Sequence, residues 1–418
     1  MDHVKRVRAW LEDKGYDGIV LSRRDNFTWV SGGAKNAVCT NTEVGIGHYV
    51  IDAEGIRLLA DSSDAPRMGK EQNPLEGETI LVPWYTSMDD YIGKMTEGKT
   101  YASDTGIAGT KNVQEELVRL RMQLCPEEVL RYREIGQTCA KIMEGVCRDA
   151  RPGQTEEEVA SELKCRCLKE GVSPDCVLVG SDERILNYRH PVPTDKKIEN
   201  SLMVVLGGEK YGLNISMTRI VYFGPVPEEI KERYEKTAYI FACMQCMMKE
   251  GMPYQEYFAK VQKLYEGVGY DGEWKLHHQG GPTGYACREF VVTPETSGEI
   301  HEGEAFAWNP TIQGTKCEET TYLTAEGIET FTRTKDWPCR EVETPYGDYE
   351  VAGVFRKKKK RGGGEKNIGI PDKQEGAERF TLCPCFITAF PISSPACISG
   401  IRLHHERLCQ AALRTRRG

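Results

Sequence analysis

The feature that most restricts the fold of this chain is a pattern of two helix pairs, each followed by strands. Residues 125–150 predict a long amphipathic helix with Pro126 in its first turn. Thr155 and Glu158 form a capping box that opens a second helix, ending near Lys169. The pattern then predicts strands at 176–180, 201–208 and 216–224, helices at 227–250 and 253–267, and strands at 288–293, 304–310, 318–324 and 328–332. This repetition predicts an α/β (α+β) fold with a duplicated sheet and helices packed on one side.

The segment before this repeat predicts a smaller domain with a mixed sheet. Its expected helices lie at 4–14, 88–96 and 112–122, and its expected strands at 18–22, 47–52, 56–61 and 79–85. We therefore expect two domains, 1–124 and 125–335, and a C-terminal extension at 336–355 packed on the second. A chain of 418 residues is long enough for each domain to bury its own core.

Charge is distributed unevenly along the chain. Residues 356–418 carry 14 Lys and Arg against 5 Asp and Glu, whereas residues 1–355 carry 41 against 58. An acidic body does not suit nucleic acid as the main partner. The tail begins with the charge run and glycines of RKKKKRGGG, so we expect 356–418 to be disordered.

The sequence shows no membrane or export signal. No apolar run reaches the roughly 20 residues that a membrane helix needs, and the charged N-terminus does not resemble a signal peptide. The 16 cysteines are scattered, including the pair Cys243 and Cys246. These features predict a cytoplasmic protein, without a membrane partner, whose cysteines are reduced thiols.

The domain order resembles that of the creatinase–prolidase–aminopeptidase P hydrolases, whose catalytic domain has the "pita-bread" fold. The segment DNFTWVSGG (25–33) resembles the turn of the family's first domain, and residues 126–332 match its catalytic domain in order and spacing. The resemblance implies a pita-bread catalytic domain behind a creatinase-type N-terminal domain. It also implies a homodimer, by analogy alone.

The peptide-cleaving members of that family hold two metal ions with two Asp, one His and two Glu. By resemblance, Val205 and Ser216 stand where the two Asp belong, and Asn309 stands where the first Glu belongs. His278 in HHQGG and Glu318 in CEET match the remaining ligands. One His and one Glu cannot bridge two dications. We therefore expect no metal pair, with a divalent Mn, Zn or Co ion at His278 and Glu318 as the alternative.

The creatinase branch of the family implies hydrolysis without a metal, with a histidine as proton shuttle. Its loop resembles NYRHP (187–191), which points to His190. A histidine titrates near pH 6.5 and can exchange protons at neutral pH. We expect His278 and Glu318 to act beside His190, and His277 to have a supporting structural role.

Four further polar residues replace or flank the missing ligands and are expected to bind substrate: Ser216, Tyr285, Arg288 and Asn309. Tyr285 stands where a second, substrate-facing His is often found in the family. Arg288 can clamp a carboxylate with two hydrogen bonds. Together with Glu318 and His278, it would orient the substrate and stabilise charge.

Three functions remain open from the sequence. The leading hypothesis is hydrolysis of a C–N or amide-type bond in a small molecule, without the metal pair. The second is an Xaa-Pro aminopeptidase or dipeptidase with a rearranged or single metal, acting on short peptides. The third is a non-catalytic protein that binds a small molecule.

Overall fold

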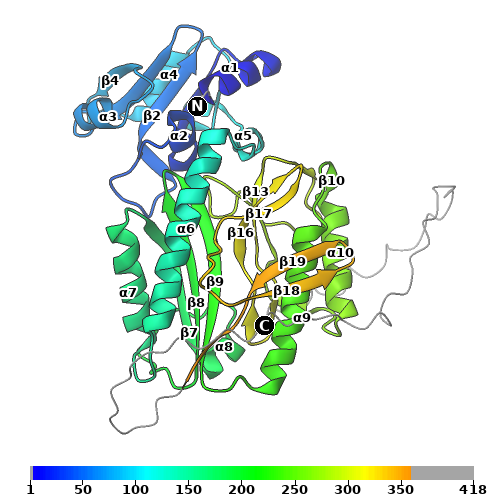
Figure 1. Cartoon of the computed structure of the whole chain (residues 1–418). Coiled ribbons are helices and arrows are strands. Elements are labelled where there is room, and N and C mark those ends of the chain that lie inside the picture. Colours follow the sequence, from blue (N-terminus) through cyan, green and yellow to red (C-terminus); the bar gives the residue numbers. More distant parts are fainter. Residues whose placement is uncertain (1–2, 359–418) are drawn as a thin grey trace, which may run out of the picture. The chain divides into compact units, whose positions relative to one another are not determined.

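Residues between Gly18 and Asn112 form a six-stranded mixed sheet in the computed structural model, which describes residues 3–358 (Figure 1). The strand order is β4-β3-β2-β1-β5-β6. The strands are β1 (Gly18–Arg23), β2 (Val44–Asp52), β3 (Ile56–Asp61), β4 (Glu78–Val82), β5 (Tyr101–Ser103) and β6 (Lys111–Asn112). Central strands β1 to β3 pair antiparallel, whereas β4, β5 and β6 join in parallel. The mixed sheet predicted for this segment is therefore present.

Five helices accompany this sheet: α1 (His3–Lys14), α2 (Arg24–Ser31), α3 (Ala65–Glu71), α4 (Met88–Thr96) and α5 (Gln114–Met122). Most of the segment read as a turn at 25–33 belongs to helix α2. Gly32 ends that helix with φ +70°, in the left-handed region, and its N–H bonds back to the last turn. A glycine adopts this conformation without the strain of a side chain.

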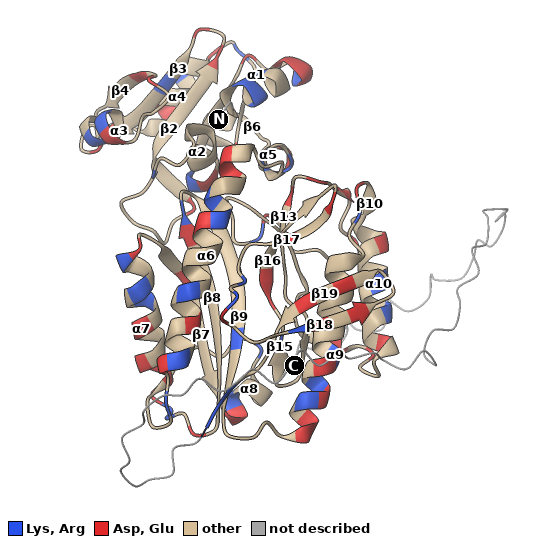
Figure 2. Cartoon of the chain, viewed as in Figure 1, with Lys and Arg blue, Asp and Glu red and all other residues tan. Residues whose placement is uncertain are grey.

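The first helix pair and its strands form one half of the duplicated unit. Helices α6 (Pro126–Asp149) and α7 (Glu156–Lys169) precede β7 (Ser173–Ser181), β8 (Ser201–Lys210) and β9 (Leu213–Phe223), which pair antiparallel. Thr155 and Glu158 form the predicted capping box. Charged residues are concentrated on the helices and are few on these long strands (Figure 2). Strand β9 is buried along its whole length and β8 over its first eight residues, whereas β7 is buried only over its last three.

The second half repeats this order. Helices α9 (Glu228–Cys246) and α10 (Tyr254–Gly267) precede a four-stranded antiparallel sheet of β11 (Gly280–Thr283), β13 (Ala305–Trp308), β16 (Glu319–Thr324) and β17 (Gly327–Thr330). Short elements between them are α8 (Glu183–Asn187), β10 (Met252–Pro253), β12 (Glu299–Ile300), β14 (Thr311–Ile312) and β15 (Thr315–Lys316). Each helix pair lies beside its own sheet (Figure 1).

The two halves meet where β9 lies beside the start of β16. The Ser216 N–H donates to Thr320 Oγ1 at 2.7 Å, and the Thr218 N–H donates to the Glu318 carbonyl at 3.2 Å. Side chains from both halves therefore converge at this seam.

The strand predicted at 288–293 is wrong. The strand here is β11, which contains the glycine pair Gly280 and Gly281. A Cβ at Gly280 would lie 2.1 Å from the Ala307 carbonyl oxygen, so glycine permits the close approach of β11 to β13. Residues 288–293 run alongside in irregular backbone, and their N–H groups reach Pro282 and Gly280.

The chain after the second sheet forms a hairpin of β18 (Cys339–Thr344) and β19 (Gly347–Ala352), followed by β20 (Phe355–Lys357). The hairpin packs on α9, with Val342, Tyr349 and Val351 in the core cluster of that helix. Strand β20 pairs parallel with β9, so Arg356 and Lys357 are ordered, contrary to the predicted tail. The rest of that prediction, 359–418, lies outside the described residues.

Within residues 3–358, every helix is too short or too polar to cross a lipid bilayer. The domain boundaries at 124/125 and 335/336 stay predictions.

Two glycines of α6 offer a matched test of helix packing. An alanine Cβ at Gly136 would lie 2.4 Å from the Phe331 carbonyl oxygen, whereas at Gly145 it meets only the flexible end of Arg166 at 3.1 Å. We expect Gly136→Ala to destabilise the protein by about 1–3 kcal/mol through overpacking. Gly145→Ala should be neutral or stabilise it by about 0.5–1 kcal/mol, because alanine favours helix. Urea unfolding measures both, and equal effects would contradict this packing.

Candidate active site

A single buried carboxylate, Glu318, lies at the seam between the two halves. Its side chain receives four contacts. Thr218 Oγ1 donates to Oε2 at 2.7 Å, and the Lys316 ammonium lies 3.2 Å from the same oxygen. Arg288 Nη2 donates to Oε1 at 3.0 Å, and Asn309 Nδ2 lies 3.4 Å from it. Both carboxylate oxygens are therefore bound, and two of the four partners are cations.

The two cations keep Glu318 ionised. Burial alone would raise the pKa of this carboxyl, but Lys316 and Arg288 outweigh burial and lower the pKa to about 2. Lys316 is itself buried, and its side chain is only 3% exposed. One negative and two positive charges leave the Glu318–Lys316–Arg288 cluster with an excess of one positive charge.

The positions that the resemblance assigns to metal carboxylates hold no carboxylate. Val205 lies buried on β8 opposite Thr218 of β9 and has no donor atom. Ser216 Oγ accepts a hydrogen bond from Arg288 Nη1 at 2.8 Å. Asn309 follows β13 and offers a neutral amide. Since Glu318 is already compensated by two cations, these residues do not fit a pair of dications, which carboxylates must bridge.

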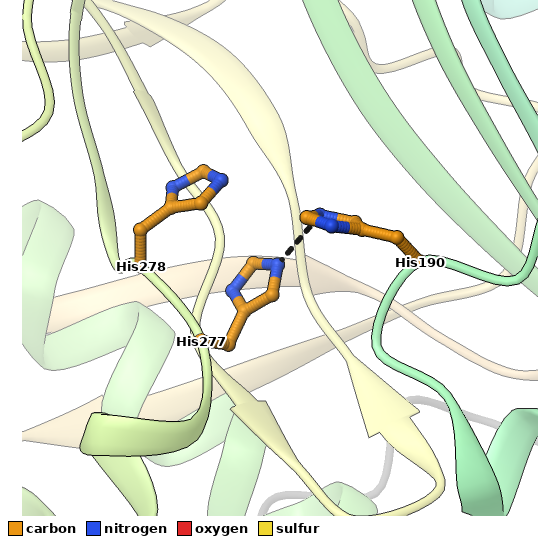
Figure 3. Close-up of side chains that lie close together, drawn as sticks. All are labelled: His190, His277 and His278. Atoms are coloured by element: carbon orange, nitrogen blue, oxygen red, sulfur yellow. Dashed lines mark hydrogen bonds between the residues drawn. The ribbon is translucent and has the colours of Figure 1, made fainter. Parts of the chain in front are cut away.

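Three histidines form a second cluster. His190 lies in the loop between α8 and β8, and His277 and His278 follow a short 3₁₀ helix (Glu273–Leu276). The Nε2 atoms of His190 and His277 lie 3.0 Å apart, and the rings of His277 and His278 stack with centroids 4.5 Å apart. Figure 3 shows the His190 ring facing the other two from a separate loop.

Neighbouring contacts hold these rings in place. Arg189 donates to Thr311 Oγ1 at 3.2 Å and so anchors the His190 loop. Gln279 Nε2 donates to the His277 carbonyl at 2.7 Å. His190 is exposed, whereas His277 is buried. The cluster is therefore open to solvent on the His190 side.

All three histidines are neutral at pH 7. Burial and then Lys316 lower the pKa of His277 to about 2, and burial and then Arg288 lower the pKa of His278 to about 4. Burial and then Lys316 also lower the pKa of His190. Two neutral imidazoles that are in contact share one N–H···N hydrogen bond, so one of His190 and His277 donates to the other.

Four of the predicted site residues, Ser216, Arg288, Asn309 and Glu318, lie in one hydrogen-bonded group, and His190 and His278 lie together in the other. Tyr285 joins neither. Its hydroxyl donates to Glu128 Oε1 at 2.6 Å inside the core.

The sequence did not predict a place in the site for Lys316 or Thr218, and it predicted only a supporting role for His277. Lys316 was detectable, because it lies two residues before Glu318 and residues at that spacing share a face of an extended segment. Thr218 directly precedes Arg219 on β9, and nothing in that segment of the sequence indicates that its hydroxyl binds a carboxylate.

The segment that carries Arg288 is held in place by an ion pair between Glu289 and helix α5. Arg121 of α5 is buried and binds Asp25 at 3.1 Å, and it also pairs with the carboxylate of Glu289. Glu289 Oε1 in turn accepts the Tyr285 N–H at 2.8 Å. Arg288 and Glu289 therefore bind different partners.

A protein-family model covers most of the duplicated unit. Residues 131–331 match the model of the Metallopeptidase family M24. No curated protein matches the sequence.

Solved structures with this fold include a prolidase from Pyrococcus horikoshii OT3, with 20% identity and a TM-score of 0.67, covering 80% of this chain and 99% of that one. An Xaa-Pro dipeptidase from Bacillus anthracis has 19% identity and a TM-score of 0.67, over 85% and 99% of the two chains. An X-Pro aminopeptidase from Thermotoga maritima MSB8 has 18% identity and a TM-score of 0.67, over 85% and 100%. These likenesses confirm the predicted fold of a pita-bread domain behind a smaller N-terminal domain.

The neutral state of His277 predicts a pH dependence of stability. Its pKa of about 2 in the folded chain lies below the ordinary value of 6.5, so the unfolded chain binds the extra proton between these values. Stability should therefore fall as pH drops below 6.5. His277→Gln should remove up to about 1.4 kcal/mol per pH unit from that slope between pH 4.5 and 6.5.

Urea unfolding across this range measures the slope. His301→Gln is the control, because Glu250 raises the pKa of that exposed histidine and its effect has the opposite sign. Equal slopes for the wild type and His277→Gln would show that His277 is protonated in the folded protein.

Proposed function

Because the chain belongs to the creatinase–prolidase–aminopeptidase P family of pita-bread hydrolases, we propose that it cleaves a C–N or amide-type bond in a small substrate without the family's pair of metal ions. The observation that carries this proposal is the compensation of Glu318 by Lys316 and Arg288. In this chain, side-chain cations provide the positive charge that dications provide in the peptide-cleaving members.

The excess positive charge of this cluster supports a substrate with a carboxylate. Arg288 is tied to Glu318 and Ser216, so it attracts the carboxylate by charge and offers its remaining N–H groups. Asn309 Oδ1 is buried and has no partner among the described residues, which leaves it free to accept from a substrate N–H. Tyr285 is left out of this proposal, because its hydroxyl is bound to Glu128.

His190 is proposed as the general base and acid. It takes a proton from the attacking water while the new C–O bond forms, and returns it to the leaving nitrogen as the C–N bond breaks. Its lowered pKa keeps it unprotonated at neutral pH, as a base must be. The contact between the Nε2 atoms of His190 and His277 orients the ring, and His278 borders the same space. Such proton transfer contributes roughly 10²–10⁴ in rate.

Two other functions keep specific support. The named relatives are prolidases and Xaa-Pro peptidases, which favours cleavage of proline-containing peptides with a single Mn, Zn or Co ion held by His278 and Glu318. The loss of three ligand positions equally suits a non-catalytic protein that binds a small molecule. A homodimer and a cytoplasmic location stay predictions.

Turnover by the chelator-dialysed protein tests the proposal. The panel should contain small carboxylate-bearing amides, guanidino compounds and Xaa-Pro dipeptides. We expect turnover of a non-peptide substrate without added metal, and a loss of about 10²–10⁴ in kcat for His190→Ala with KM little changed. Surface variant His301→Ala is the control.

Turnover restricted to Xaa-Pro dipeptides and restored only by Mn, Zn or Co would favour the single-metal peptidase. Binding of panel compounds that is equal in wild type and His190→Ala, without turnover by either, would favour the non-catalytic protein.

A further inference from the structure

We propose that His190, His277 and His278 form a site for one divalent metal ion of the zinc type, which uses no carboxylate and shares only His278 with the ligands that the family resemblance assigns. One ligand atom from each residue lies within 4.8 Å of the other two. In a tetrahedral zinc site with bonds of about 2.0–2.1 Å, ligand atoms lie about 3.4 Å apart. The His190–His277 distance of 3.0 Å is already close to that value, and ring rotations that bring all three ligand atoms to this spacing would enclose an ion.

Unpaired nitrogen atoms leave more than one choice of ligand atom at His277 and His278. The Nδ1 atoms of His277 and His278 are buried and have no hydrogen-bond partner among residues 3–358. Leaving a buried polar atom unpaired costs about 1–3 kcal/mol. Metal coordination by one ring nitrogen also fixes which nitrogen carries the proton. The rings are neutral at pH 7, as metal ligands must be.

The ligand set selects the class of metal. Three imidazoles suit zinc, copper, nickel or cobalt, whereas magnesium and calcium prefer oxygen. Three protein ligands also leave a fourth position open to water, and the exposed His190 gives access from solvent. Lys316 and Arg288 repel a dication, and Glu318 offsets only part of this, so binding should be weaker than at a closed structural zinc site.

Metal binding would have a functional consequence, which rests on the proposed function. A metal on the His190 lone pair prevents that nitrogen from accepting a proton. Zinc should therefore inhibit hydrolysis by the chelator-treated protein in competition with protons. The binding site itself does not depend on this consequence.

The test is zinc titration of the chelator-dialysed full chain, followed by calorimetry and by metal analysis. The chain also holds cysteines and the histidines His404 and His405, which could bind zinc as well. The number of zinc ions bound and their affinity are therefore compared between each variant and the wild type. We expect His277→Ala to bind one zinc ion fewer per chain than the wild type, or to bind it at least tenfold more weakly. His301→Ala, at an exposed histidine outside the cluster, should bind as the wild type does.

Two further variants separate this site from alternatives. His190→Ala replaces an exposed ligand and so guards against misfolding of His277→Ala; it should lose the same ion. Glu318→Gln, checked for folding by circular dichroism, should keep the ion but bind it more weakly, because Glu318 is not a ligand and only offsets part of the repulsion from Lys316 and Arg288. Cobalt bound at the site should give a tetrahedral visible spectrum without the thiolate charge-transfer band of cysteine sites.

Unchanged zinc binding in both histidine variants would overturn the proposal. Loss of the ion in Glu318→Gln together with the histidine variants would overturn it in favour of the family's carboxylate site. Metal-free turnover that survives either result would leave the proposed function intact, so the two failures are distinguishable.

Discussion

The ion cluster around Glu318 is the interaction on which the rest of the seam depends. A buried charge that loses its partner destabilises a protein by about 3–5 kcal/mol. Here one carboxylate, 4% exposed, is matched by Lys316 from its own segment and by Arg288 from a separate one. The positions that the resemblance assigns to further carboxylates hold the uncharged side chains of Val205, Ser216 and Asn309. These uncharged side chains and the two buried cations are therefore parts of one electrostatic arrangement.

Neighbouring charges extend this arrangement across both halves of the duplicated unit. Glu319 follows Glu318, and successive side chains of a strand point to opposite faces. Glu318 faces the candidate site, whereas Glu319 binds the buried Arg219 of β9 at 2.8 Å. Arg219 also reaches Glu144 of α6 at 3.4 Å. Two adjacent glutamates thus serve different purposes, one in the site and one in joining a helix to the seam.

The sequence predicted the elements whose signals are local. The capping box at Thr155, the proline in the first turn of α6 and the alternation of helices and strands all appear in the structure. The sequence did not predict the features that depend on contacts between residues far apart in the chain. Helix α2 was read as a turn, and a strand was predicted at 288–293 instead of at β11, because the pairing of β11 with β13 depends on distant residues. Motif position placed Tyr285 in the site, but its hydroxyl pairs with Glu128, 157 residues earlier in the chain.

The two side-chain clusters are electrostatically coupled, and Lys316 is the link. It lowers the pKa of His190 and His277 as well as that of Glu318. For the carboxyl this stabilises the charged form, whereas for the imidazoles it stabilises the neutral one. Lys316 thus acts together with burial at the histidines and with Arg288 at Glu318, and it favours an ionised carboxylate and unprotonated imidazoles at the same pH. Because Lys316 is part of the chain, its effect on these pKa values does not depend on a bound ion.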